Sequence, residues 1–212
     1  MATVLIDKNV MVPMRDGVRL VTDVYRLDGA APAPVLLART PYDKERAMAS
    51  TGVPFDILRV VQDGYAVVTQ DVRGRYASEG AFAPMFQETR DGVDTIAWAA
   101  AEPWSRGVVG TFGGSYVGCT QWLPAREHPP ALRAMAPAVT FSDMYEGNTY
   151  QGGAKVLHDL RWVVANIIPG EIRRRVMRGG KPPEGAASLD VNAVLADLPL
   201  ADHPLIHDLA PF

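Results

Sequence analysis

A glycine-rich turn at residues 113–118 surrounds a single serine, Ser115. An apolar, β-rich run precedes it at 108–112, and a segment that can form a helix follows it. A serine held in a sharp turn between a strand and a helix is exposed at the top of a sheet, where it can act as a nucleophile. The usual G-x-S-x-G pattern is not matched, because the second glycine falls three residues after the serine. The turn alone therefore leaves open an ordinary glycine-rich connection.

Other catalytic patterns are not indicated. Neither G-x-x-x-x-G-K-[ST] nor G-x-G-x-x-G is present, which argues against a phosphate-binding loop. The single cysteine, Cys119, excludes an internal disulfide and the multi-cysteine metal patterns. Histidines and carboxylates do not cluster as metal ligands do. We therefore expect no metal and no cofactor, and a metal- or nucleotide-dependent enzyme is a remote alternative.

The composition is that of a soluble globular protein. Of 212 residues, 48% are hydrophobic and 21% are charged, with a net charge of −3. Without a basic excess to neutralise phosphates, we expect no nucleic-acid partner. Residues 1–9 lack the apolar core of a secretory signal, and no apolar run is long enough to cross a bilayer. We expect a cytoplasmic protein that does not bind membranes; its oligomeric state is not indicated.

Alternating short apolar runs and helical patterns must position the serine. Asp16-Gly17 between two β-rich runs predicts a hairpin at the N-terminus. The sequence thus predicts an α/β doubly wound sheet with an antiparallel N-terminal hairpin. The hairpin strands are expected at 10–13 and 18–25, further strands at 35–38, 65–71, 108–112 and 132–139, and helices at 88–101, at 116–126 and, after a loop, within 48–62.

The pattern changes beyond residue 140. Segments 141–148, 154–168 and 171–178 look helical or irregular, and 179–187 is rich in glycine and proline. A short helix and loop are expected at 190–202, with no further buried strand. We therefore divide the chain into an α/β core at 1–140 and a helical segment at 141–212.

Several short motifs can be considered together. They are MRDGVRL at 14–20, RTPYDK at 39–44, QDVRG at 70–74, SEG at 78–80 and GGSYVG at 113–118, with QW at 121–122. Together they resemble the N-terminal part of the cocaine esterase / Xaa-Pro dipeptidyl-peptidase-like family of α/β-hydrolases. The resemblance covers nearly all of residues 9–165, and this family carries its glycine three residues after the serine.

The resemblance implies roles for three residues. Ser115 is the nucleophile, and the backbone N–H of Tyr116 is one donor to the oxyanion. The hydroxyl of Tyr42 is the second donor, on the loop where this fold places one. The alternative for Tyr42 is an aromatic residue of a turn. Asp71, Arg73 and Glu79 also match the motifs of the family. We interpret them as ion-pair and turn residues that hold the loop carrying Tyr42.

Residues 141–170 resemble the start of the helical cap that this family places over its active site. Trp162 and Tyr150 could then line a substrate pocket, since such pockets have apolar, aromatic walls. Ordinary packing between helices explains both residues equally well.

A general base for the serine is not evident. In this fold an acid and then a histidine follow the nucleophile, each after a further strand. The four histidines, His128, His158, His203 and His207, lack that context. We therefore expect a truncated chain that ends inside the cap and leaves an unpaired apolar edge at strand 132–139.

The predicted function is that of a serine hydrolase acting on a small-molecule ester or a short peptide of the Xaa-Pro type through an acyl-enzyme. The isolated chain is expected to show weak turnover at most. The alternative is a non-catalytic α/β-hydrolase-like binding module that kept the turn and lost the triad.

Overall fold

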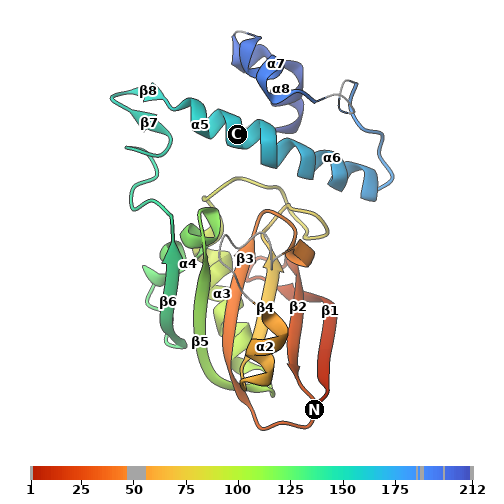
Figure 1. Cartoon of the computed structure of the whole chain (residues 1–212), viewed down its shortest axis with the longest axis vertical. Coiled ribbons are helices and arrows are strands. Elements are labelled where there is room, and N and C mark those ends of the chain that lie inside the picture. The colour runs from red at the N-terminus through yellow and green to blue at the C-terminus, as the bar shows by residue number, and fades with distance from the viewer. Residues whose placement is uncertain (1, 47–55, 185, 187–188, 198, 211–212) are drawn as a thin grey trace. The chain divides into compact units, whose positions relative to one another are not determined.

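The computed structural model describes residues 2–46, 56–184, 186, 189–197 and 199–210. Contacts divide the chain into two compact units, Met1–Thr140 and Phe141–Phe212, which we describe separately. The first unit holds one six-stranded sheet (Figure 1). Its strands are β1 (Val4–Pro13), β2 (Arg19–Leu27), β3 (Ala33–Thr40), β4 (Ala66–Asp71), β5 (Ser105–Gly114) and β6 (Leu132–Ala138), and its helices are η1 (Lys44–Arg46), α2 (Ile57–Gln62), α3 (Glu88–Ala101) and α4 (Tyr116–Ala125).

The strands follow the order β1-β2-β4-β3-β5-β6. β1 and β2 form an antiparallel hairpin, β2 is antiparallel to β4, and the other neighbours are parallel. Gly17 in the hairpin turn has φ +84°, a value that favours glycine. The predicted α/β sheet with an antiparallel N-terminal hairpin is confirmed. β6 lies at one edge of this sheet.

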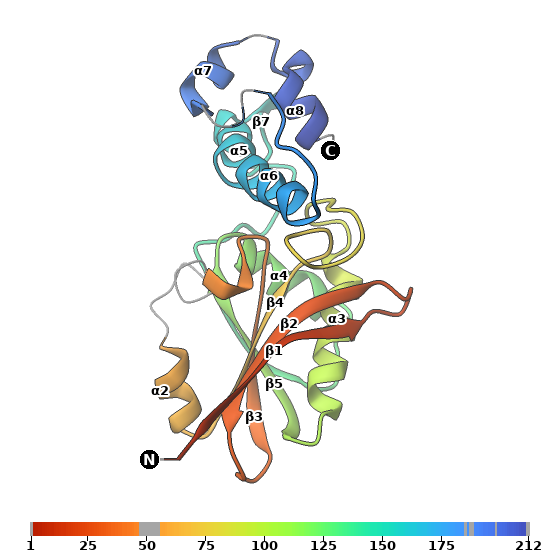
Figure 2. The ribbon, with the colours of Figure 1, turned by 90° about the vertical axis from the view of Figure 1, so that its right-hand side faces the viewer.

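The central strands are covered on both faces. Every residue of β4 is buried. Val68 packs in one cluster with Ile96 of α3, whereas Val67 packs in another with Ile57 of α2. Because successive strand residues point to opposite faces, α3 and α2 cover opposite faces of the sheet (Figure 2). This double cover explains the continuous apolar runs of the parallel strands.

The start of the first strand differs most from prediction at the N-terminal side of the core. β1 begins at Val4 rather than at residue 10. Its first six residues, three apolar and then three polar, show no alternation, and residues 4–7 are held by pairing with β2. The loop and helix predicted within 48–62 correspond to α2 where the structure describes them, and residues 47–55 lie outside the described residues.

The second unit is mostly helical. Its first residues are irregular, and a short antiparallel strand pair, which we did not predict, follows. The two strands are two residues each, too short to give a pattern in the sequence. The elements are β7 (Tyr150–Gln151), β8 (Ala154–Lys155), α5 (Leu157–Trp162), the π-helix η2 (Val163–Ile167), α6 (Ile168–Met177), α7 (Val191–Ala196), η4 (Leu200–Asp202) and α8 (Pro204–Leu209).

One helical run contains α5, η2 and α6, where the sequence suggested two separate segments. Trp162, Ile167 and Ile168 keep helical backbone angles at the junctions. Pro169 in the first turn of α6 has no N–H to donate, and the π-helix precedes it directly. The proline therefore changes the hydrogen-bond pattern without ending the run.

No helix among the described residues has both the length and the apolar character needed to cross a bilayer.

Candidate active site

Ser115 lies at the junction of β5 and α4 with a strained backbone. Its φ is +57° and its ψ is −125°, in a region that residues other than glycine rarely adopt. Its N–H donates to the carbonyl oxygens of Ala138 (2.9 Å) and Val139 (3.1 Å) at the end of β6. The residue is exposed, although its neighbours on both sides are buried. The turn thus presents one hydroxyl at the carboxyl end of the parallel strands.

The unusual glycine spacing has a steric cause. A Cβ on Gly118 would lie 2.5 Å from the Cβ of Thr140, which is closer than real contacts. Val117, where the usual motif has glycine, is fully buried in the core cluster that includes Ile57 and Phe112. Glycine is therefore needed three residues after the serine and not two.

This contact predicts that Gly118→Ala destabilises the fold by about 1–3 kcal/mol through overpacking. The measurement is urea unfolding of the variant against wild type. The double variant Gly118→Ala, Thr140→Gly removes the opposing atoms and should recover most of the loss. Equal destabilisation in the single and double variants would contradict the steric explanation.

The side chain of Tyr116 is fixed beneath the turn. Its hydroxyl donates to Glu88 Oε1 (2.9 Å) and accepts the Met85 N–H (3.0 Å). Burial, and then the charge of Glu88, raises the pKa of Tyr116 well above its ordinary value. Burial also raises the pKa of Glu88, which the ion pair from Arg39 (2.9 Å) opposes. The first residue of α3 thus supports the residue after the serine.

Tyr42 is half-buried on the loop after β3. Its N–H donates to Thr40 Oγ1 (3.0 Å), and its ring meets the Tyr116 ring edge-to-face with 6.4 Å between centroids. The structure therefore brings Tyr42 to the residue that follows Ser115. Their roles at an oxyanion remain predictions.

Asp71, at the end of β4, binds the same loop. It is buried, and its Oδ1 accepts the Lys44 N–H at 2.7 Å. Arg73 pairs with Asp91 (2.7 Å), and Glu79 pairs with Arg19. These contacts agree with our interpretation of Asp71, Arg73 and Glu79 as ion-pair and turn residues.

Burial raises the pKa of Asp71 to about 8. The ordinary value of 3.8 applies in the unfolded chain, so the folded state binds the extra proton between pH 4 and 8. The protonated carboxyl of Asp71 therefore contributes its full stabilisation of the folded state below pH 4. This contribution is lost as the pH rises through 8. We expect Asp71→Asn to melt at least about 5 °C above wild type at pH 9 and close to it at pH 4. The exposed control Asp28→Asn should show no such pH dependence, and a pH-independent difference for Asp71→Asn would contradict the assignment.

Trp162 and Tyr150 both lie in the second unit. Trp162 is half-buried against the helical cluster that includes Val163. The ring of Tyr150 stacks on that of Tyr145 with 4.6 Å between centroids. Each thus has a packing partner within its own unit.

The histidines lie in varied settings. His128 is exposed after α4, and His158 is exposed on α5. His203 Nδ1 accepts the Leu205 N–H (3.3 Å) and caps α8, while its Nε2 lies 3.9 Å from Asp197. Asp197 and His203 follow the nucleophile in the order acid, then histidine. The helix-capping hydrogen bond of His203 explains its position.

The sequence reasoning missed a buried polar network under the turn. Arg39 Nε donates to Gln70 Oε1 (2.8 Å), and Gln70 Nε2 donates to Thr22 Oγ1 (3.0 Å). Arg39 also pairs with Glu88, which reaches Tyr116. The only signal in the sequence is the presence of polar residues inside otherwise apolar strands.

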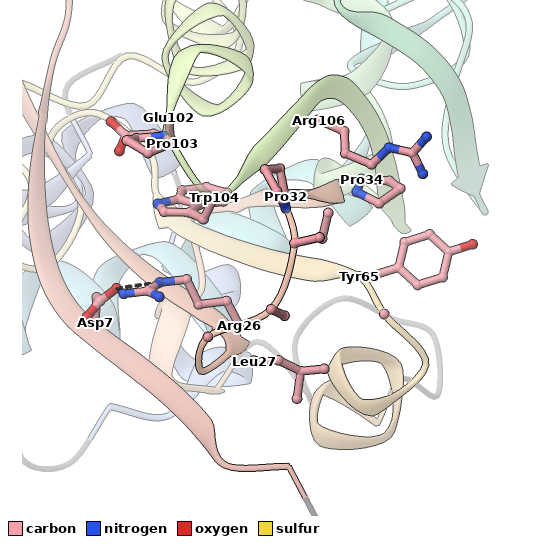
Figure 3. Close-up of a pocket in the computed structure, with 15 residues that line it drawn as sticks. Asp7, Arg26, Leu27, Pro32, Pro34, Tyr65, Glu102, Pro103, Trp104 and Arg106 are labelled. Atoms are coloured by element: carbon pink, nitrogen blue, oxygen red, sulfur yellow. Dashed lines mark hydrogen bonds and ion pairs between the residues drawn. The ribbon is translucent and has the colours of Figure 1, made fainter.

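A separate pocket of about 840 Å³ opens at the other end of the sheet (Figure 3). Trp104, Pro32 and Tyr65 line it, and the Arg26–Asp7 ion pair lies at one side. It lies by the amino ends of the parallel strands, whereas ligands of open α/β sheets bind beyond the carboxyl ends. We therefore place the candidate active site at Ser115.

A mixed sheet of this kind, with a strained serine between a parallel strand and the next helix, defines an α/β-hydrolase. The chain belongs to the X-Pro dipeptidyl-peptidase (S15) family, whose model matches residues 16–188.

Known relatives are hydrolases. The cocaine esterase of Rhodococcus sp. (strain MB1 Bresler) is 42% identical over 212 aligned residues, which cover 96% of this chain and 37% of that protein. A CocE/NonD family hydrolase from Staphylococcus aureus superposes with a TM-score of 0.70 at 27% identity, over 94% of this chain and 37% of that one. An α-amino acid ester hydrolase gives a TM-score of 0.65 at 31% identity, over 77% and 30% of the two chains. The present chain thus spans about a third of the length of these relatives.

Proposed function

We propose that this chain carries the nucleophile and the oxyanion hole of a serine hydrolase, which cleaves an acyl ester or an Xaa-Pro-type amide. The observation that carries the proposal is the exposed Ser115 with its strained backbone at the strand-to-helix turn. Membership in a hydrolase family and likeness to two ester hydrolases support it. The substrate is a small-molecule ester or a short peptide.

In the proposed reaction, Ser115 Oγ forms a bond to the acyl carbon and passes its proton to a general base. The carbonyl electron pair moves to oxygen, where the Tyr116 N–H and the Tyr42 hydroxyl donate hydrogen bonds. The tetrahedral intermediate then expels the alcohol or amine, which takes up the proton. Water hydrolyses the acyl-enzyme by the same steps.

The general base is not assigned to any of the four histidines. His203 serves as a helix cap, and His128 follows α4 at its end away from Ser115. We assign residues 141–212 to a helical cap segment, with Trp162 and Tyr150 as substrate-lining residues. The aromatic character of both side chains supports this assignment.

The test is labelling of the full gene product by a fluorophosphonate probe, which phosphonylates activated serines. We expect the label on the peptide that contains Ser115, and no label in Ser115→Ala. Ser142→Ala, which changes an exposed serine, is the matched control and should label normally. Labelling that persists in Ser115→Ala would refute the assignment, and ligand binding without labelling would favour the binding-module alternative.

A further inference from the structure

Buried polar groups form hydrogen bonds and an ion pair with the loop that carries Tyr42. Asp71 Oδ1 accepts the Lys44 N–H at 2.7 Å, and the two residues are 2% and 3% exposed. This bond ties the loop after β3 to the end of the neighbouring strand β4, two residues beyond Tyr42.

The Lys44 side chain ties the same loop to the first two strands. Its Nζ lies 2.8 Å from Asp23 Oδ1 on β2 and 2.9 Å from Asn9 Oδ1 on β1. Asp23 is fully buried. Burial raises the pKa of Asp23, but its hydrogen bonds from Lys44 and Lys8 outweigh this and lower the pKa overall. The loop is therefore anchored to a charged carboxylate inside the protein.

A third contact links the loop, through two side chains, to the ring of Tyr116. Arg75 Nε donates to the carbonyl oxygen of Pro41 (3.0 Å), directly before Tyr42. The Arg75 guanidinium lies 5.1 Å from the centre of the Phe82 ring, and this ring lies 6.3 Å from that of Tyr116.

Buried charges are costly and rarely improve stability over apolar packing. Here the buried ion pair of Lys44 and Asp23 and the buried carboxyl group of Asp71 converge on one short loop. A donor to an oxyanion must be fixed within about 0.5 Å. Buried polar groups that hydrogen-bond to the loop of such a donor can fix it in this way.

We propose that Asp71 and Lys44 are positioning residues that hold the Tyr42 hydroxyl in line with the oxyanion. The inference rests on the proposed function of Tyr42. It adds that two residues without contact to substrate act through that hydroxyl.

The first test compares Lys44→Met with Lys8→Met in the full gene product, with a p-nitrophenyl ester as substrate. Lys8 is the matched control, because its Nζ lies 2.6 Å from the same Asp23 but belongs to β1, outside the loop. We expect Lys44→Met to lower kcat about 10- to 100-fold with little change in KM. Lys8→Met should keep kcat within about twofold of wild type, because the loop keeps its own contact with Asp23 through Lys44.

The second test asks whether the effect passes through Tyr42. In a Tyr42→Phe background, Lys44→Met should lower kcat no further, because the positioned hydroxyl is already absent. Asp71→Asn keeps an acceptor for the Lys44 N–H and should retain most activity, whereas Asp71→Leu should resemble Lys44→Met. Asp71→Leu leaves the Lys44–Asp23 ion pair intact. If Lys44→Met does not fold, Asp71→Leu therefore replaces it in the double-mutant cycle with Tyr42→Phe.

The outcomes separate the two proposals. If Tyr42→Phe lowers kcat and the second substitution adds its full effect, the positioning inference is overturned while the oxyanion assignment stands. If Tyr42→Phe itself has no effect, the proposed role of Tyr42 fails, and the probe experiment on Ser115 still decides the nucleophile.

Discussion

Replacement of Ser115 by alanine is expected to lower kcat for ester hydrolysis by about 10⁴-fold or more in the full gene product. The substitution removes the atom that bonds to the acyl carbon, so no acyl-enzyme can form. Residual turnover would come from the oxyanion donors acting on bound water. Steady-state hydrolysis of a p-nitrophenyl ester measures the effect.

Ser142→Ala is the control for this measurement and should match wild type. Circular dichroism should show an unchanged fold for Ser115→Ala, since the side chain is exposed and makes no capping hydrogen bond. A variant that keeps more than a tenth of the wild-type kcat would show that Ser115 is not the nucleophile.

Replacement of Tyr42 by phenylalanine is expected to lower kcat about 10²- to 10³-fold, the usual effect of removing one donor to an oxyanion. KM should change little, because the negative charge develops only in the transition state. The ring contact with Tyr116 persists in phenylalanine, so the variant isolates the hydroxyl.

Tyr65→Phe removes a phenolic hydroxyl from the pocket at the opposite end of the sheet and serves as the control. It should leave kcat unchanged. An equal loss in both variants would indicate a general effect on folding. A rise in KM alone for Tyr42→Phe would instead indicate that the hydroxyl binds the ground state of the substrate.

Local patterns predicted most of the first unit. The predicted helix 88–101 has the bounds of α3, and the predicted strand 65–71 differs from β4 by one residue. These segments carry their own periodicity, because both faces of β4 and one face of α3 are buried in apolar clusters. The strand pair β7–β8 and the π-helix η2 were missed, since two-residue strands and a shifted hydrogen-bond pattern leave no periodic signal.

The sequence by itself determined the order of strands and helices and the turn that carries Ser115, since these depend on neighbours within a few residues. The tertiary structure alone decided which side chains meet at that turn. Tyr42 reaches Tyr116 across 74 positions (116 − 42), and Lys44 reaches Asp23 across 21 (44 − 23). Such pairs have no sequence signature, because the partner of a buried polar group depends on which elements pack beside it.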